Sequence, residues 1–582
     1  MTEALKLLHQ QGFSGLTCQF ATFIDRKEAG KSTVVSLTAG LLTEAMSQGH
    51  VCLNLANPPE TIHQLNAFLP NNTADWQQQL REAKSIGKPG DYTPLILTEN
   101  GLLYLYRFWR DEQDVAHAIM QRRHAVDNVN LKQLQQDLAN WHNPIAGVDW
   151  QKVAVAMALS RHLAVISGGP GTGKTTIVLK ILQCLHNQSD SLRIGLAAPT
   201  GKAAARLQQS ISQQQTLEVK TLHRLLGITE HNDQGRYNAE RPLPLDVLII
   251  DEASMIDISL MAKLIRAMPA KARLILLGDS QQLASVESGA VLANLSESQQ
   301  GTFTADFVAQ FPALGLEDNT VQNETALLID SFVRLQHSYR FDKDSLVGQL
   351  ADRVNAADAE TTIQLLNEQT EVIWFRTDER SVLNILTTGY KAFISAVENR
   401  LPAQDIIQAF DQFRVLAALK QGPQSVMSVN RLMSRFLAQK GWRTNQTFYS
   451  GRPIMITQND YRQQLFNGDI GIILRDADGH LKACFYFGEA LRWVSLNRLP
   501  AHETVFAMTV HKSQGSEFDA VSILLPDEIC PILSRELLYT AITRARKTLT
   551  ILAVENVLKH TIHRRHQRES GLAYRIERSG KH

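Results

Sequence analysis

The segment SGGPGTGKTTI at residues 167–177 restricts the fold more than any other stretch of the chain. It has the spacing G-x-x-x-x-G-K-[ST] of a phosphate-binding loop (P-loop), a turn that joins a buried strand to a helix. The apolar run HLAVISG leads into it, and KTTIVLKILQCLHN follows with helical periodicity. Strand, loop and helix in this order predict an α/β protein that binds a nucleoside triphosphate at the edge of a parallel sheet.

The loop gives an expected role to its polar side chains. Lys174 is placed to bridge the β- and γ-phosphates of ATP, and the Thr175 hydroxyl is placed to bind Mg²⁺. The glycines allow successive backbone N–H groups to point at phosphate oxygens. The nucleotide-binding residues that follow from this pattern are Gly168, Gly169, Pro170, Gly171, Thr172, Gly173, Lys174, Thr175 and Thr176.

A Gly-Lys-Ser at residues 30–32 resembles the Gly-Lys-Thr of the P-loop but lacks the rest of the pattern. Asp25 stands where the first glycine is needed, and Glu28 adds another carboxylate close to the expected β-phosphate, which would repel it. No apolar strand ending in paired acidic residues follows nearby. We therefore expect Lys31 and its neighbours to open the helix TVVSLTAGLLTEAMSQG, and we expect one nucleotide site rather than two.

Two apolar strands farther along the chain end in polar residues that suit ATP hydrolysis. LDVLIIDEASMID carries Asp251, expected to hold Mg²⁺ through water, and Glu252, expected to polarise the attacking water. ARLILLGDSQQLASV carries Gln282 beyond the carboxyl end of a strand, where open α/β sheets bind ligands. Gln282 is therefore a candidate sensor of the γ-phosphate.

Together these segments resemble superfamily 1 helicases, and the resemblance continues on both sides of the P-loop. In that family a glutamine reads the adenine, a tyrosine stacks on it, and two arginines from the second motor lobe reach the γ-phosphate. The resemblance gives these roles to Gln151 in DWQKVAVAMALS, to Tyr339 and Arg340 in QHSYRF, and to the arginine finger Arg544 in YTAITRARKTL.

Two further segments match the motifs with which that family contacts DNA. AAPTGKAAARL matches motif Ia, and AMTVHKSQGSEF matches motif V. The resemblance implies that single-stranded DNA crosses the lobes there, with backbone contacts from Pro199, Thr200, Thr509 and His511. For His511, an ordinary place in the core or between the lobes stays open.

Four segments match a narrower family within this superfamily: ISGGPGTGKTT, APTGKAAARL, FNGDIGI and TVHKSQGSEF. In these segments the chain resembles the RecD family, the alpha chains of the bacterial RecBCD enzyme (exonuclease V). The resemblance implies a 5′→3′ single-strand DNA translocase and helicase in a heterotrimer with RecB and RecC. Such a subunit acts on duplex ends, in double-strand break repair by homologous recombination and in degradation of linear DNA. Nuclease activity is expected in a partner chain.

Other functions stay open beside this one. The chain could be a standalone RecD-like helicase or the helicase half of a conjugative relaxase, although a metal-binding histidine cluster with a nucleophilic tyrosine is not found. It could be an assembly subunit with a dead ATPase, although every catalytic residue type is present. A nuclease is disfavoured because the chain lacks an obvious D…ExK pattern.

Patterning along the chain suggests two RecA-like motor lobes with additions. Short alternating strands around RPIMITQND and DIGIILRDADGHLKACFYF favour a small β-barrel, similar to the SH3-like domain of related helicases. The segment 227–244 could form a strand-separating hairpin or a plain surface loop. We expect a helical N-terminal domain at 1–125, a first lobe at 126–345, a second lobe at 346–430 and 500–582, and the β-barrel inserted at 431–499. The resemblance to the RecD family implies that the N-terminal domain docks on RecC.

Composition limits the location and the partners. Lysine plus arginine number 59 and aspartate plus glutamate 58, so any DNA-binding groove has to be local. The five cysteines form no CxxC pair, which argues against a zinc site and fits a cytoplasmic protein. The start does not resemble a signal peptide, and no apolar stretch approaches the roughly 18 residues that span a bilayer, so no membrane partner is expected. The basic end KHTIHRRHQRESGLAYRIERSGKH could be solvated or could face DNA.

Overall fold

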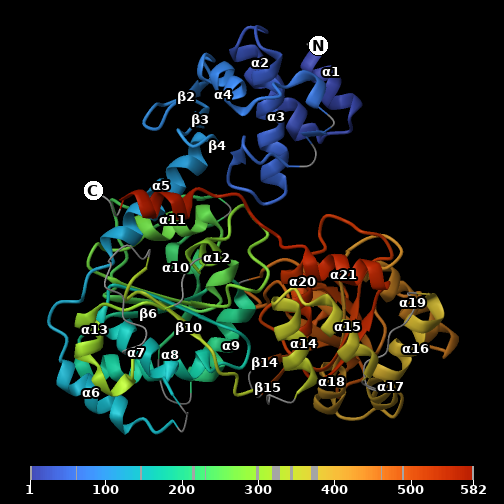
Figure 1. Cartoon of the computed structure of the whole chain (residues 1–582). Coiled ribbons are helices and arrows are strands. Elements are labelled where there is room, and N and C mark those ends of the chain that lie inside the picture. Colours follow the sequence, from blue (N-terminus) through green and yellow to red (C-terminus); the bar gives the residue numbers. More distant parts are fainter. Residues whose placement is uncertain are drawn as a thin grey trace.

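Four sheets organise the protein, whose computed structural model describes residues 3–579 apart from 60–61, 64, 144–146, 213–216, 230, 297–300, 317–327, 341–344, 369–377, 461 and 488–489. Two of the sheets are parallel and define two lobes that lie side by side, while the N-terminal elements form a separate body above one lobe (Figure 1). Within the described ranges, every helix is too short or too polar to cross a lipid bilayer.

The first lobe is a six-stranded parallel sheet in the order β10-β5-β9-β8-β6-β7. Alternate residues of its strand Leu163–Gly168 enter two different buried clusters, one on each face, so the strand is apolar throughout. The strands are β5 (Leu163–Gly168), β6 (Ile194–Ala198), β7 (Val219–Thr221), β8 (Val247–Ile250), β9 (Arg273–Gly278) and β10 (Phe332–Leu335). The helices are α6 (Leu131–Asn140), α7 (Trp150–Ser160), α8 (Lys174–Gln188), α9 (Gly201–Ile211), α10 (Leu222–Leu226), α11 (Ile258–Ala267), α12 (Val291–Ser296) and α13 (Ala305–Gln310).

The second lobe is a four-stranded parallel sheet in the order β17-β11-β18-β19. Its largest buried cluster joins all four strands to the surrounding helices. The strands are β11 (Phe413–Ala417), β17 (Ala507–Thr509), β18 (Phe518–Leu524) and β19 (Ala545–Leu552). The helices are α14 (Leu346–Asn355), α15 (Ala359–Glu368), α16 (Glu379–Gly389), α17 (Lys391–Glu398), α18 (Ala403–Asp411), α19 (Val426–Gln439), α20 (Arg535–Ile542) and α21 (Glu555–His563).

An antiparallel sheet in the order β15-β14-β13-β12-β16 interrupts the second lobe between α19 and β17. It encloses a small core of its own that includes Ile454 and Phe485. It spans 452–504 rather than 431–499, because α19 packs with the lobe as far as Gln439 and the last strand pairs with β12. The strands are β12 (Arg452–Ile456), β13 (Ile470–Arg475), β14 (Leu481–Phe487), β15 (Ala490–Ser495) and β16 (His502–Thr504).

The N-terminal region is mixed rather than purely helical. A sheet in the order β1-β4-β3-β2 packs with the helices, because LIL and LLYL are short apolar runs that pair with each other. The strands are β1 (Leu53–Asn54), β2 (Ile86–Gly87), β3 (Leu95–Leu97) and β4 (Leu102–Leu105). The helices are α1 (Glu3–Gln10), α2 (Gly15–Lys27), α3 (Thr33–Ser47), α4 (Thr73–Arg81) and α5 (Tyr106–Gln121), the last of which packs on α11.

The Gly-Lys-Ser segment at residues 30–32 precedes a helix, as predicted. The Ser32 side chain caps α3 by accepting from the Val35 backbone N–H at 3.3 Å. Asp25 accepts from the Ser36 hydroxyl at 3.1 Å, and the Glu28 carboxylate accepts from the Ser85 backbone N–H at 2.7 Å. These carboxylates therefore tie the N-terminal region together, and α2 rather than a strand precedes the turn.

The end of the chain leaves the second lobe, contrary to the expectation that 500–582 belongs to it. We call residues 564–579 the C-terminal strap; it ends in α22 (Leu572–Ser579). Leu572 and Ile576 are buried among side chains of α5 and the first lobe, because they form the apolar face of this helix. In Figure 1 the red strap runs from α21 to the side of α5 and α11. The basic tail is thus docked on protein.

The segment 227–244 contains turns rather than a long hairpin. A single antiparallel bridge joins Thr229 to Asn232, and residue 230 lies outside the described residues. Lys263 on α11 pairs with Asp233 at 2.6 Å. In its described residues the segment therefore carries no strand ladder that would project from the lobe.

Candidate nucleotide site between the lobes

The P-loop connects β5 to α8 and has the backbone that its glycines allow. Gly171 and Gly173 have φ values of 79° and 83°, a region that other residues rarely adopt. A Cβ atom on Gly173 would lie 2.2 Å from Gln151 Nε2, so this position also requires glycine for space. Lys174 opens α8, and its Nζ donates to the Gly168 and Gly169 carbonyls at 2.6 and 3.0 Å.

Gln151 and Tyr339 approach the P-loop from two sides. Gln151 Nε2 donates to the Thr172 carbonyl at 2.9 Å, and the Tyr339 backbone N–H donates to the Gly171 carbonyl at 2.8 Å. Asn143 joins them, because its Nδ2 lies 3.2 Å from Gln151 Oε1 and 3.0 Å from Tyr339 Oη. The sequence patterns did not point to Asn143. Tyr339 is 49% exposed, and the His337 ring packs against it with 4.6 Å between the ring centroids.

The acidic pair follows β8 at the sheet edge next to the P-loop. Glu252 has φ 54°, an uncommon conformation for a residue with a side chain, and its backbone N–H donates to Asp251 Oδ1 at 2.9 Å. Burial and the neighbouring Glu252 raise the pKa of Asp251 to about 6, although Lys174 opposes the shift. A carboxylate in this setting is favoured in its ionised form by a cation.

Gln282 is held by a network that crosses the cleft. Its Nε2 donates to Asp279 Oδ2 at 2.9 Å, and the Tyr539 hydroxyl of α20 donates to the same oxygen at 3.1 Å. Next to Gln282, the Leu283 backbone N–H donates to Thr540 Oγ1 at 2.9 Å. Gln514 Nε2 donates to the Leu283 carbonyl at 2.8 Å. Side chains of the second lobe therefore fix this loop of the first lobe.

Tyr539 was not predicted as a site residue, although a signal was present. It is the aromatic residue of α20, two residues before Ala541 and Ile542 end the helix and five before the predicted Arg544. It is 4% exposed, and a Cβ atom on Gly169 would lie 2.9 Å from its hydroxyl oxygen. A buried hydroxyl in such a helix normally needs a specific partner, which here is Asp279.

Three arginines surround Glu517, a residue that the sequence patterns also did not indicate. Its carboxylate lies 2.6 Å from Arg206, 2.9 Å from Arg340 and 3.3 Å from Arg546. Burial alone would raise the pKa of Glu517, but Arg206 and Arg340 lower it to about 2. Its interactions are therefore present above the ordinary carboxylate pKa and are lost only as the pH falls toward 2.

The two predicted arginines reach the cleft from different places. The resemblance implied that Arg340 belongs to the second lobe, but it lies in the segment after β10 of the first lobe. The hydrogen bond from the Tyr339 backbone N–H to the P-loop holds it there. Arg544 is 3% exposed and donates to the Ser516 and Thr540 carbonyls at 3.2 and 3.1 Å. It comes from the end of α20 in the second lobe.

These groups line one cavity of about 280 Å³ between the lobes. Gln151 and Thr172 support the loop from behind, and Thr176 is exposed on α8. The site residues that line the cavity are Pro170, Gly171, Gly173, Lys174, Thr175, Arg206, Asp251, Glu252, Gln282, Tyr339, Arg340, Glu517 and Arg544.

The four candidate DNA contacts lie outside this cavity. Pro199 and Thr200 follow β6, and Thr200 caps α9 by accepting from the Ala203 backbone N–H at 3.2 Å. Thr509 ends β17 and accepts from the Lys512 backbone N–H at 3.3 Å. His511 follows it; burial and the nearby Arg568 lower its pKa, which favours the neutral ring.

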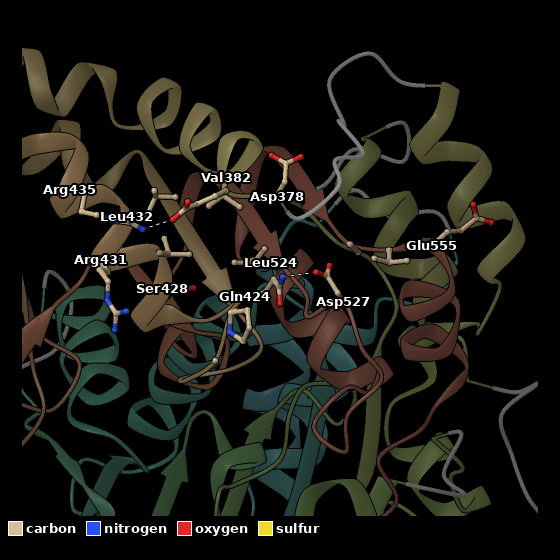
Figure 2. Close-up of a pocket in the computed structure, with 16 residues that line it drawn as sticks. Asp378, Val382, Gln424, Ser428, Arg431, Leu432, Arg435, Leu524, Asp527 and Glu555 are labelled. Carbon is tan, nitrogen blue, oxygen red and sulfur yellow. Dashed lines mark hydrogen bonds and ion pairs between the residues drawn. The ribbon is translucent and has the colours of Figure 1, made fainter. Parts of the chain in front are cut away.

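A second cavity, of about 1310 Å³, lies at the carboxyl edge of the sheet in the second lobe (Figure 2). This is the edge at which the first lobe carries its P-loop. Here the polar groups are already paired with each other: Arg435 with Glu379, and Gln424 Nε2 with Asp527 Oδ2 at 2.6 Å. Acidic residues occupy the starts of α16 and α21. This edge therefore does not repeat the nucleotide site.

Comparison with known proteins agrees with this arrangement. Residues 9–104 match the N-terminal domain of RecBCD enzyme subunit RecD, 151–288 an AAA domain and 504–552 a UvrD-like helicase C-terminal domain. RecBCD enzyme subunit RecD of Haemophilus influenzae is 36% identical, over 89% of this chain and 86% of the relative. The chain belongs to the RecD family. The site of this RecD family member is that of an ATP-dependent DNA helicase.

Two further relatives distinguish this RecD chain from longer helicases. RecBCD enzyme subunit RecD of Mycobacterium tuberculosis is 34% identical, over 94% of this chain and 92% of the relative. An ATP-dependent RecD2 DNA helicase of Deinococcus radiodurans is 29% identical, over 69% of this chain but only 48% of its own length.

Proposed function

We propose that this chain is the 5′→3′ motor subunit of a RecBCD heterotrimer with RecB and RecC. It moves along single-stranded DNA from duplex ends, in homologous recombination at double-strand breaks and in degradation of linear DNA. The observation that carries the proposal is the cavity in which the P-loop and acidic pair of one lobe face Arg544 of the other. Near full-length similarity to RecD subunits, against half-length similarity to the RecD2 helicase, favours a subunit over a standalone helicase.

In the proposed site, residues of the first lobe bind and activate ATP. Lys174 bridges the β- and γ-phosphates, Gln151 and Tyr339 hold the adenine, and Glu252 polarises the attacking water. Gln282 senses the γ-phosphate. Thr175 and the buried carboxylate of Asp251 suit Mg²⁺, which when bound neutralises charge on the phosphates.

Closure of the lobes completes the proposed site. Arg544 is carried by the second lobe, while Arg340 and Arg206 are held by Glu517. A γ-phosphate can replace the Glu517 carboxylate as the anion between these guanidinium groups, because it offers more acceptor oxygens and more charge. Loss of the γ-phosphate returns Arg206 and Arg340 of the first lobe to Glu517 of the second lobe, so direct ion pairs replace the phosphate between the lobes.

The DNA track is proposed to cross both lobes at motifs Ia and V. Pro199 and Thr200 in the first lobe, and Thr509 and His511 in the second, supply backbone contacts. Cycles of closing and opening move the strand between these contacts. We propose that the antiparallel sheet 452–504 is an SH3-like barrel beside this track, since Phe466 of its loop packs on Gly201 of motif Ia.

The test is co-purification with RecB and RecC chains, followed by unwinding of duplexes with 5′ or 3′ single-stranded tails. To isolate this motor, the ATPase of the other motor subunit, RecB, is inactivated by substitution of its P-loop lysine. We expect a stable heterotrimer that unwinds 5′-tailed DNA. Failure to co-purify would favour a standalone helicase, and unwinding of 3′-tailed DNA alone would refute the polarity.

A further inference from the structure

Arg568 of the C-terminal strap is built into the loop that follows Gln282. Its Nη1 donates to the carbonyls of Glu287 and Gly289 at 2.7 and 2.8 Å and to Ser285 Oγ at 3.3 Å, and its Nη2 donates to the Ser285 carbonyl. A guanidinium group can span several carbonyls in this way, whereas an ammonium group is too compact. One side chain therefore fixes the path of Ser285–Gly289.

The start of the strap is anchored to α20, which carries Tyr539 and is followed by Arg544. The Arg535 backbone N–H, at the first residue of α20, donates to the Arg564 carbonyl at 2.8 Å. The His566 backbone N–H donates to Glu536 Oε2 at 2.9 Å. Arg568 thus extends the second lobe onto the first at a point separate from the nucleotide cavity.

The N-terminal region meets the same point. The Gly289 backbone N–H donates to the Gly49 carbonyl at 2.9 Å, and the Val51 backbone N–H donates to the Glu569 carbonyl at 2.9 Å. The Glu569 backbone N–H in turn donates to His50 Nδ1 at 2.9 Å. Gly49 has φ +91°, and a Cβ atom there would lie 2.9 Å from the Arg568 guanidinium carbon. The N-terminal region, the Gln282 loop and the strap therefore share one junction.

We propose that Arg568 is a positioning residue that holds Ser285–Gly289, and through it Gln282, in a placement set jointly by the second lobe and the N-terminal region. The state of the N-terminal region thereby alters the ATPase rate. This inference rests on the proposed role of Gln282. It accounts for the close packing of a glycine of the N-terminal region against a side chain of the strap.

The first test compares Arg568→Gln with Arg578→Gln, which loses only an exposed pair with Glu99. In the full chain, Arg568→Gln is expected to lower the kcat of DNA-stimulated ATP hydrolysis roughly 5-fold or more, with little change in the KM for ATP. Hydrogen exchange of 284–290 is expected to quicken. Arg568→Lys restores the charge but not the bridging, so it is expected to remain defective.

The second test reaches the junction from the N-terminal side without touching the strap. Gly49→Ala places a methyl group against Arg568, while Gly90→Ala has similar backbone strain at φ +102° but no atoms within 4 Å. Gly49→Ala is expected to reproduce the loss of kcat, and Gly90→Ala is not. Because both changes act on one contact, the double variant Gly49→Ala with Arg568→Gln is expected to have the same kcat as the more defective single variant.

Two outcomes overturn the proposal. One is normal kcat and normal exchange of 284–290 in Arg568→Gln. The other is equal loss in Gly49→Ala and Gly90→Ala, which would indicate general strain in the N-terminal region. Gln282→Ala is measured in parallel: if its kcat is normal, the sensor role in the proposed function fails, whereas the exchange of 284–290 still decides whether Arg568 holds the loop.

Discussion

At the scale of single residues, the Tyr539 hydroxyl links the second lobe to Asp279, which holds the proposed sensor Gln282. Tyr539→Phe keeps the ring in its buried place but removes the bond to Asp279, the partner of Gln282. Because a lost hydrogen bond is worth about 1 kcal/mol, we expect kcat to fall roughly 5-fold while ATP binding changes little. Steady-state ATPase measurements check this, with the exposed Tyr574→Phe as control.

The lysines of Gly-Lys-Ser 30–32 and Gly-Lys-Thr 173–175 make a matched pair of substitutions. Lys174→Gln is expected to abolish DNA-stimulated ATP hydrolysis, because Lys174 lies in the interlobe cavity. Lys31→Gln is expected to leave hydrolysis unchanged, because Lys31 lies in the turn between α2 and α3. An ATPase assay of both variants is sufficient, and a loss of turnover in the Lys31 variant would reopen the question of a second site.

Glu252→Gln is expected to separate nucleotide binding from hydrolysis. The amide keeps the size of the side chain, and Lys174 and Asp251 remain to bind the nucleotide. If Glu252 polarises the water, turnover should fall by roughly 10²–10⁴-fold. Binding of a fluorescent ATP analogue should persist; equal losses of binding and turnover would show instead that Glu252 is structural.

At the scale of elements, α22 is fastened by a buried carboxylate. Glu112 on α5 is fully buried and accepts from Tyr104, Ser570, the Gly571 backbone N–H and Arg575. Glu112→Ala removes the carboxylate that Arg575 pairs with, a change that typically costs about 3–5 kcal/mol in a buried setting. We expect a clearly lower Tm in thermal unfolding, whereas Glu99→Ala at the exposed pair should shift it little.

The elements also show how far the sequence could be interpreted. The P-loop, the acidic pair and the parallel strands were predictable, because each depends on residues close together in the chain. The strap was not predicted, and its residues were assigned to the second lobe at 346–430 and 500–582. Arg568 binds backbone carbonyls, which every sequence has, so no side-chain pattern indicates this contact. Glu517 and Asn143 were missed for a related reason, because Arg206, a partner of Glu517, and Tyr339, a partner of Asn143, are 311 and 196 residues away in the sequence.

At the scale of the whole molecule, the ion pairs of Glu517 with Arg206 and Arg340 join the two lobes, and in the proposed function the nucleotide competes for these arginines. Glu517→Gln removes that competition, and charged hydrogen bonds are worth about 1.5–3 kcal/mol. Without DNA, we therefore expect an ATP analogue to bind roughly 5-fold tighter or more. Equilibrium fluorescence titration measures this, with Asp519→Asn, which loses a surface pair with Lys547, as control. Weaker binding in Glu517→Gln would show that Glu517 supports the nucleotide site rather than competing with its ligand.

The docking of Leu572 and Ile576 beside Val51 and Tyr104 also has a consequence for biosynthesis. A ribosome makes Val51 and Tyr104 long before Leu572 and Ile576, so the apolar surface around Tyr104 stays uncovered until the strap has been synthesised. Exposed surface of this kind is what chaperones bind and what drives aggregation. A prematurely terminated product would keep that surface open and would leave Glu112 without three of its donors. Synthesis of the strap is thus the step that covers the core of a nascent chain.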